Sequence, residues 1–208
     1  MTFRISPSFT SEKLSSGMLE DKIDVYEDRL KGWFLKPARS LLSEPNSELA
    51  VLQLALGYFE GYAIYRKGTD SRARSKEFFR QAFLEVFPHS KRAKHLGLDP
   101  TPIDLSKLVN VLYEDARCGL FHDGMIRHRI VLAPSSAPIS VASHKTTRDI
   151  SAIVIDPSKF LNAIEAHFKD YLSKLRDPNN KELRANFKAA WELKNPLVPL
   201  RLPPGGIP

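Results

Sequence analysis

Apolar residues recur at intervals of three or four along most of this chain, a spacing that places them on one face of an α-helix. The pattern predicts about six helices, each separated from the next by turn-forming or helix-capping residues. The expected helices cover about 18–42, 47–67, 71–87, 101 to 119 or 124, 156–175, and a last stretch after the turn at 177–180.

The second of these stretches is apolar almost all round. Between Leu49 and Tyr65 its only formal charge is Glu60, so we expect it in the middle of a helical bundle. It contains Gln53 and is short for a bilayer span, so no membrane segment is expected. A carboxylate in such a helix is costly unless it is paired or protonated. Glu60 should therefore reach a solvent-facing edge or meet a cation such as Arg117, and the pattern leaves both open.

The periodicity changes between 126 and 155, where β-branched residues alternate in part with polar ones. Strand-like runs at 126–132, 138–142 and 151–155 are separated by turn-rich segments. These runs predict a small antiparallel meander. The expected fold class is therefore mainly α, a helical bundle with a small antiparallel β insertion near 126–155.

Differences in composition divide the chain into three segments. Residues 1–17 are Ser-rich and irregular, which indicates a flexible N-terminal arm, and 18–194 carry all the predicted elements as a single domain. The tail 195–208 has five prolines and two glycines and is expected to be extended or disordered. Within the domain, Pro37 should kink the first helix or end its regular part, Thr101 should cap the fourth helix, and Asp156 should cap the fifth.

Composition narrows the function classes. A formal net charge of +7 is compatible with a polyanionic partner such as RNA, although many proteins with such a surplus bind no nucleic acid. The single cysteine, Cys118, excludes an internal disulfide and a cysteine-rich zinc site. Together with the lack of a signal-peptide pattern, it favours a cytoplasmic protein. No residue cluster predicts a metal site, and no glycine-rich phosphate loop predicts a nucleotide cofactor.

Candidate chemistry is concentrated in Tyr113-Glu-Asp-Ala-Arg-Cys-Gly-Leu-Phe-His-Asp-Gly124, at the end of the fourth helix. This stretch holds Arg117 and His122, a cation and a group that titrates near neutrality. On an uninterrupted α-helix, residues five apart lie about 140° apart around the axis. The two side chains would converge if the helix broke near Gly119, or if two copies of the chain each brought one pair to a shared cleft.

An arginine and a histidine suit metal-free RNA cleavage. A ribose 2′-OH attacks the adjacent phosphorus, histidine can act as base or acid, and a guanidinium can stabilise charge on the non-bridging oxygens. The pathway needs the 2′-OH, so RNA would be cut and DNA would not. In the alternative interpretation, Arg117 is a cation favoured by the helix C-terminus and His122 caps or packs nearby.

The segment Arg117-Cys-Gly-Leu-Phe-His122, followed by Asp-Gly, resembles the R-x4-H signature of the HEPN superfamily, in the version found in uncharacterised stand-alone bacterial HEPN-like proteins. The resemblance spans about 18–194, and the motif is its specific anchor. It implies an HEPN-like bundle that forms a homodimer through the motif-bearing helices. It also implies that Arg117 and His122 are the catalytic pair of a metal-independent endoribonuclease. Many members act in toxin–antitoxin, phage-defence or RNA-processing systems, so an RNA substrate and an antitoxin or other partner protein are implied.

The resemblance extends to residues around the motif. Members often carry a polar or acidic residue on an earlier helix, and Glu60 is the best match, with Tyr113 and Asp123 as further supporting residues. Three basic residues beyond the motif are expected to bind phosphates, although alternation along a strand would split them between two sheet faces: Arg127, His128 and Arg129. The β insertion departs from the minimal four-helix pattern. Some HEPN-like proteins bind nucleotides or act as interaction and dimerisation modules, which is the alternative function.

Overall fold

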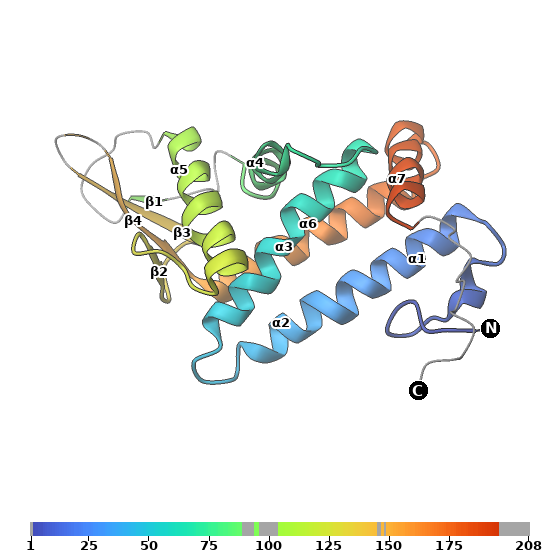
Figure 1. Ribbon diagram of the computed structural model, residues 1–208, viewed down its shortest axis with the longest axis horizontal. Coiled ribbons are helices and arrows are strands. Elements are labelled where there is room, and N and C mark those ends of the chain that lie inside the picture. The colour runs from blue at the N-terminus through green and yellow to red at the C-terminus, as the bar shows by residue number, and fades with distance from the viewer. Residues whose placement is uncertain (1, 89–93, 96–103, 145–146, 148, 196–208) are drawn as a thin grey trace, which may run out of the picture.

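A computed structural model describes residues 2–88, 94–95, 104–144, 147 and 149–195. These residues form six helices and a four-stranded sheet, so the fold is mainly α with a small β insertion, as predicted (Figure 1). Beyond Asn195, the Pro-rich tail lies outside the described residues. A short 3-10 helix, η1 (Ser11–Leu14), comes first. The first long helix runs from α1 (Leu19–Leu30) through η2 (Lys31–Leu35) into α2 (Lys36–Leu41), and the fourth runs from α5 (Leu105–Val111) into η4 (Leu112–Asp123). The other four helices are α3 (Glu48–Lys67), α4 (Ser75–Val86), α6 (Pro157–Arg176) and α7 (Lys181–Lys194).

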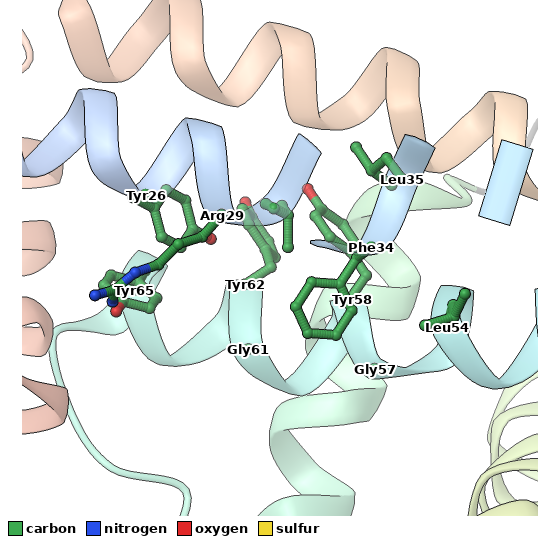
Figure 2. A pocket seen from close by; sticks show the side chains of 11 residues that line it. Tyr26, Arg29, Phe34, Leu35, Leu54, Gly57, Tyr58, Gly61, Tyr62 and Tyr65 are labelled. Atoms are coloured by element: carbon green, nitrogen blue, oxygen red, sulfur yellow. The ribbon is translucent and has the colours of Figure 1, made fainter. Parts of the chain in front are cut away.

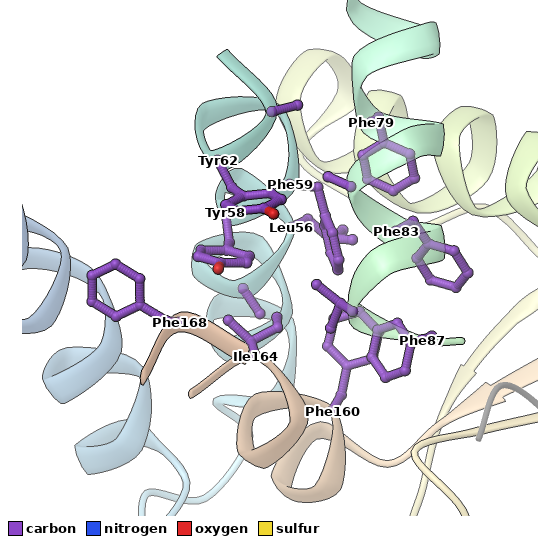
Figure 3. Packing of buried hydrophobic residues seen from close by; sticks show 14 of the residues in the cluster. Leu56, Tyr58, Phe59, Tyr62, Phe79, Phe83, Phe87, Phe160, Ile164 and Phe168 are labelled. Carbon is purple, nitrogen blue, oxygen red and sulfur yellow. The ribbon is translucent and has the colours of Figure 1, made fainter. Parts of the chain in front are cut away.

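The apolar helix α3 is the centre of the bundle, which confirms its predicted place. It contacts α2, α4, α6, α7 and the two π-helical segments η2 and η4. Its Phe59 ring lies 5.1 Å from the Phe79 ring, 5.7 Å from Phe83 and 5.9 Å from Phe160 between centroids (Figure 3). Burial of each such side chain contributes roughly 1.5–3 kcal/mol, so this aromatic cluster is a main source of stability.

The first helix accommodates Pro37 without ending at it. The five residues before α2 form the π-helical turn η2, in which the N–H of Lys36 donates to the carbonyl of Lys31. Proline lacks an N–H group, and its ring clashes with the carbonyl four residues earlier in a regular α-helix. The wider π turn relieves that clash, and the helix continues to Leu41.

The N-terminal residues are anchored on α1, in contrast to the flexible arm expected from the sequence. The Ser6 hydroxyl donates to an Asp28 carboxylate oxygen at 2.6 Å, and the Ser8 N–H donates to the same oxygen at 2.7 Å. Arg29 Nε donates to the carbonyl of Ile5 at 2.7 Å, and Ile5 is buried. A serine-rich segment has no apolar periodicity, so its contacts depend on partners that only the fold supplies.

Two helices begin later than their patterns predict. α4 begins at Ser75 because Ala73 has a left-handed backbone with φ of 58°, which a right-handed helix cannot include. α5 begins at Leu105, and the Asp104 carboxylate is its N-cap, accepting from the N–H groups of the second and third helical residues. Thr101, the predicted cap, lies outside the described residues.

The sheet is mixed, so the predicted antiparallel meander is wrong. Its strands are β1 (Lys94–His95), β2 (Ile130–Leu132), β3 (Ile139–Ser143) and β4 (Ile150–Ile155), in the order β1-β3-β4-β2. Only β3 and β4 pair in the antiparallel sense, whereas β2 is parallel to β4 and β1 is parallel to β3. The sheet lies at one end of the bundle, beside α5 (Figure 1).

The connection between β2 and β3 explains this topology, because it crosses the end of β4. The Ala133 N–H donates to the carbonyl of Ile155, and the Asp156 N–H donates to that of Pro138, both at 3.1 Å. The Asp156 carboxylate accepts from the Ser135 N–H at 3.1 Å and also caps α6, as predicted. These bonds place β2 and β3 on opposite sides of β4, which a tight hairpin could not do.

Candidate functional site

The Arg117 and His122 stretch forms the π-helix η4, not an α-helix that breaks at Gly119. A π-helix closes its hydrogen bonds between residues five apart, as the Gly124 N–H does with the carbonyl of Gly119. Residues five apart therefore lie about one turn apart, on the same side of the helix. The helix ends at Gly124, whose φ of 71° is the left-handed conformation that favours glycine.

Gly119 has a packing role in place of the expected break. A Cβ atom on Gly119 would lie 2.5 Å from the carbonyl oxygen of Met125. The chain can therefore fold back along the π-helix, where the Arg127 N–H donates to the carbonyl of Asp115 at 2.9 Å. The close approach joins the end of η4 to the segment that leads into β2.

Arg117 meets Glu60, which resolves the alternatives left open by the sequence. Arg117 Nη2 lies 2.9 Å from Glu60 Oε2, and the two side chains are 21% and 20% exposed. Ser71 Oγ donates to the other Glu60 oxygen at 2.7 Å. Burial raises the pKa of the Glu60 carboxyl, but the hydrogen bonds from Ser71 and Ser75 and the charge of Arg117 outweigh it, so the pKa is lowered overall. Glu60 is therefore an ionised partner that holds the guanidinium in place.

Two aromatic rings flank the same guanidinium. Arg117 Cζ lies 4.9 Å from the Phe121 ring centroid and 5.7 Å from that of Tyr113. Tyr113 packs edge-on against buried Phe79 at 5.4 Å, and burial is the main cause that raises the pKa of its hydroxyl. Phe121 is 45% exposed. Arg117 thus connects the bundle core to an exposed aromatic side chain.

His122 is exposed at the last turn of η4. Within residues 2–88, 104–144 and 149–195, no group is hydrogen-bonded to its imidazole ring. Met125, three residues further on, is also exposed. The histidine therefore lies at the surface beside apolar side chains, while Arg117 lies deeper.

The three basic residues beyond the motif lie in the turn before β2, so the predicted alternation between sheet faces does not occur. Arg127 Nη2 lies 3.4 Å from Asp123 Oδ2, and both side chains are exposed. Arg129 Nε lies 2.6 Å from an oxygen of buried Asp115, and this hydrogen bond raises the pKa of Arg129. His128 is exposed. Arg129 is therefore a structural partner of Asp115 through its Nε group.

Sequence reasoning missed two residues of the site. The pattern places Ser71 at the start of the third predicted helix, yet its hydroxyl completes the hydrogen bonding of Glu60. Asp115 is not among the predicted site residues, although a carboxylate in a helix with an apolar stripe, followed by a basic stretch, indicates a possible ion pair. In both cases the partner lies on a different segment of the chain.

Within the described part of the chain, no three His, Cys, Asp or Glu side chains are grouped as metal ligands. In the same residues, no helix is long and apolar enough to cross a membrane. Comparison with protein-family models, curated proteins and solved structures gave no match for this chain.

Proposed function

We propose that this protein is a metal-independent endoribonuclease with Arg117 and His122 as its catalytic pair. The observation that carries the proposal is the π-helical geometry of η4, because it brings residues five apart to the same side of the helix. An α-helix would turn them apart. π-helical segments are rare in proteins, and those that occur are often found at functional sites. The presence of one over the motif therefore supports a role beyond packing.

The two side chains have different tasks in the proposed reaction. The ribose 2′-oxygen forms a bond to phosphorus, the bond from phosphorus to the 5′-oxygen breaks, and a 2′,3′-cyclic phosphate and a 5′-hydroxyl remain. Exposed His122 transfers a proton from the 2′-OH or to the leaving oxygen. Arg117 stabilises the charge on the non-bridging oxygens with the N–H groups that Glu60 does not use. Glu60 acts through Arg117 as a positioning residue.

A homodimer would supply the second proton-transfer group. One imidazole can serve as base or as acid in a single step, so two copies of His122 in one cleft would provide both. The exposed side chains of Phe121 and Met125, next to His122, form an apolar surface suited to such a contact. By the resemblance to HEPN proteins, the system would be a toxin or phage-defence system, with an antitoxin or partner protein.

The alternative is a non-catalytic HEPN-like module that binds a nucleotide or a protein, or dimerises. The Arg117–Glu60 pair favours it, because the charge of Arg117 is already balanced in the resting protein. The same exposed apolar side chains would then form the interface without any cleavage.

Cleavage of a labelled mixed-sequence RNA in EDTA tests the proposal. We expect the wild type to leave 2′,3′-cyclic phosphate ends and to spare DNA. His122→Ala should lose about 100-fold or more of the rate, because a general acid–base group contributes on the order of 10²–10⁴-fold. The readout is the cleavage rate together with the chemistry of the new ends.

His144→Ala is the matched control, since His144 is also exposed but lies after β3, outside the motif. It should cleave at the wild-type rate. Equal cleavage by wild type and His122→Ala would exclude His122 as a catalytic residue. A folded wild type that cleaves no RNA but shifts its melting temperature with a nucleotide would favour the binding module.

A further inference from the structure

An aromatic groove of about 210 Å³ lies between the first helix and α3, lined by residues of α1, η2 and α3. Tyr26 and Phe34 line it from the first helix, and Tyr58, Tyr62 and Tyr65 line it from α3 (Figure 2). Next to Phe34, Trp33 is exposed on the same π-helical segment. None of the roles described above uses these tyrosines.

Two glycines leave free space along the α3 side of the groove, and hydrogen bonds fix two of its tyrosine side chains. A Cβ atom on Gly57 or Gly61, one helical turn apart on α3, would meet no atom within 4 Å. The Tyr58 hydroxyl is 2.7 Å from His167 Nδ1, and the Tyr62 hydroxyl donates to a Glu85 oxygen at 2.5 Å. These hydrogen bonds hold both rings in position, so the groove is preformed and another backbone can approach α3 closely.

The C-terminal segment of the chain begins at one end of this groove. Arg29, which lines the groove beside Tyr65, donates from Nη1 to Asn195 Oδ1 at 2.7 Å (Figure 2). The next residues are Pro196-Leu-Val-Pro199. A proline, two residues and a second proline is the spacing that aromatic grooves recognise in a polyproline II segment.

The length of the segment matches the groove. Leu54 and Tyr65 mark its two ends on α3 and are about 16 Å apart along the helix axis at ~1.5 Å per residue. About five or six residues of polyproline II cover that distance at ~3.1 Å each. The sequence continues through 196–208, so it has more than enough length.

We propose that the groove binds the proline-rich segment 196–208 of the same chain, with Pro196 and Pro199 against the accessible rings of Tyr65 and Phe34. Attachment through Asn195 gives the segment an effective concentration in the millimolar range, so even a weak site is occupied. An external proline-rich partner would have to compete with this tethered segment. The proposal is independent of the proposed nuclease activity.

Trypsin cleavage after Arg201 tests the proposal, because Arg201 is the one Lys or Arg in 196–208. Intact mass would follow loss of the last seven residues from the full chain, with a free peptide of residues 195–208 as the reference. We expect cleavage in the full chain to be slower than in the peptide by roughly tenfold or more, because the protease must wait for release. Gly61→Leu, which fills the groove, should restore the rate of the free peptide.

A double variant, Pro196→Ala with Pro199→Ala, tests the same contact without altering the groove and should also restore fast cleavage. Pro203→Ala with Pro204→Ala is the matched control and should keep the protection. Cleavage of the full wild-type chain at the free-peptide rate would overturn the proposal. So would equal protection in the wild type and both variants, or protection that disappears on dilution, which would place the segment in another copy.

Discussion

Glu60 illustrates how a single side chain is held by several segments at once. It projects from α3, accepts a hydrogen bond from Ser71 in the following linker, and pairs with Arg117 on η4. The sequence indicated that a carboxylate in this apolar helix needs either solvent or a cation, and it named Arg117 as the candidate cation. The sequence could not choose between solvent exposure and this ion pair, because the choice depends on how η4 crosses α3.

Loss of this pair should destabilise the fold. Glu60→Ala leaves Arg117 without its partner in a position where only 21% of its side chain is exposed. We expect the free energy of unfolding to fall by about 2 kcal/mol, less than for a fully buried pair and more than for a surface pair. Urea denaturation of the wild type and the variant would measure the difference.

The pair between Asp123 and Arg127 is the matched control for Glu60, since its side chains are 53% and 50% exposed. Asp123→Ala should change the free energy of unfolding by no more than about 0.5 kcal/mol. If Glu60→Ala has an equally small effect, the Arg117 pair is energetically a surface contact, and its part in positioning the guanidinium would be in doubt.

At the scale of elements, η4 changes the interpretation of the motif. A spacing of five is wrong for one face of an α-helix, which is why the sequence suggested a break or a dimer. The break is wrong, since the helix continues as a π-helix to Gly124. The dimer stays a prediction. Helical periodicity in the sequence does not distinguish a π-helix from an α-helix over a single motif, because the difference appears only in the backbone hydrogen bonds.

Gly119→Ala should destabilise this element even though alanine is the better helix former. Its Cβ would lie 2.5 Å from the Met125 carbonyl oxygen, so the backbone of the segment leading to β2 must move. We expect a loss of about 1–3 kcal/mol, typical of overpacking, in place of the ~1 kcal/mol gain that alanine usually brings in a helix. Thermal or urea unfolding would measure it.

Asn110→Ala in α5 is the control for Gly119→Ala, because Asn110 is exposed in the same continuous helix. It should be neutral or slightly stabilising, within about 0.5 kcal/mol. A stabilised Gly119→Ala protein would mean that the segment after η4 does not pack against the helix as described.

At the scale of the whole molecule, His167 joins α6 to the central helix α3. It lies on α6, its Nδ1 shares a hydrogen bond of 2.7 Å with the Tyr58 hydroxyl of α3, and the Tyr62 ring is edge-on to it at 4.6 Å between ring centroids. Burial lowers the pKa of its imidazole, partly opposed by the charges of Glu85 and Asp170. The folded protein therefore favours the neutral ring.

This pKa shift predicts an acid-sensitive fold. Because the pKa of His167 is lower in the folded state, the unfolded chain binds the extra proton first, near its ordinary pKa of about 6.5. The stabilisation is present above that pH and is lost as the pH falls from there through the folded-state pKa. Urea midpoints at pH 7 and pH 5 should differ more for the wild type than for His167→Gln.

His144→Gln is the control for this pH dependence and should behave like the wild type, since His144 is exposed. If His167→Gln retains the full wild-type difference between pH 7 and pH 5, the acid sensitivity comes from other groups. The lowered imidazole pKa would then contribute nothing measurable to stability.

The sequence by itself determined the parts of this protein that depend on local pattern. Six helices, the central place of the apolar helix 47–67, the cap at Asp156 and the positions of β3 and β4 follow from periodicity, capping chemistry and β propensity within short windows. Each of these features depends on residues a few positions apart in the chain.

Only the tertiary structure decided the features that join distant segments. The parallel pairing of β2 with β4, the anchoring of the N-terminal residues on Asp28 and the pairing of Glu60 with Arg117 each involve partners well separated in sequence. No local window contains the competing partners, and their free energies differ only once desolvation and packing in the folded molecule are included. The pattern could therefore identify which residues needed partners, and the fold selected them.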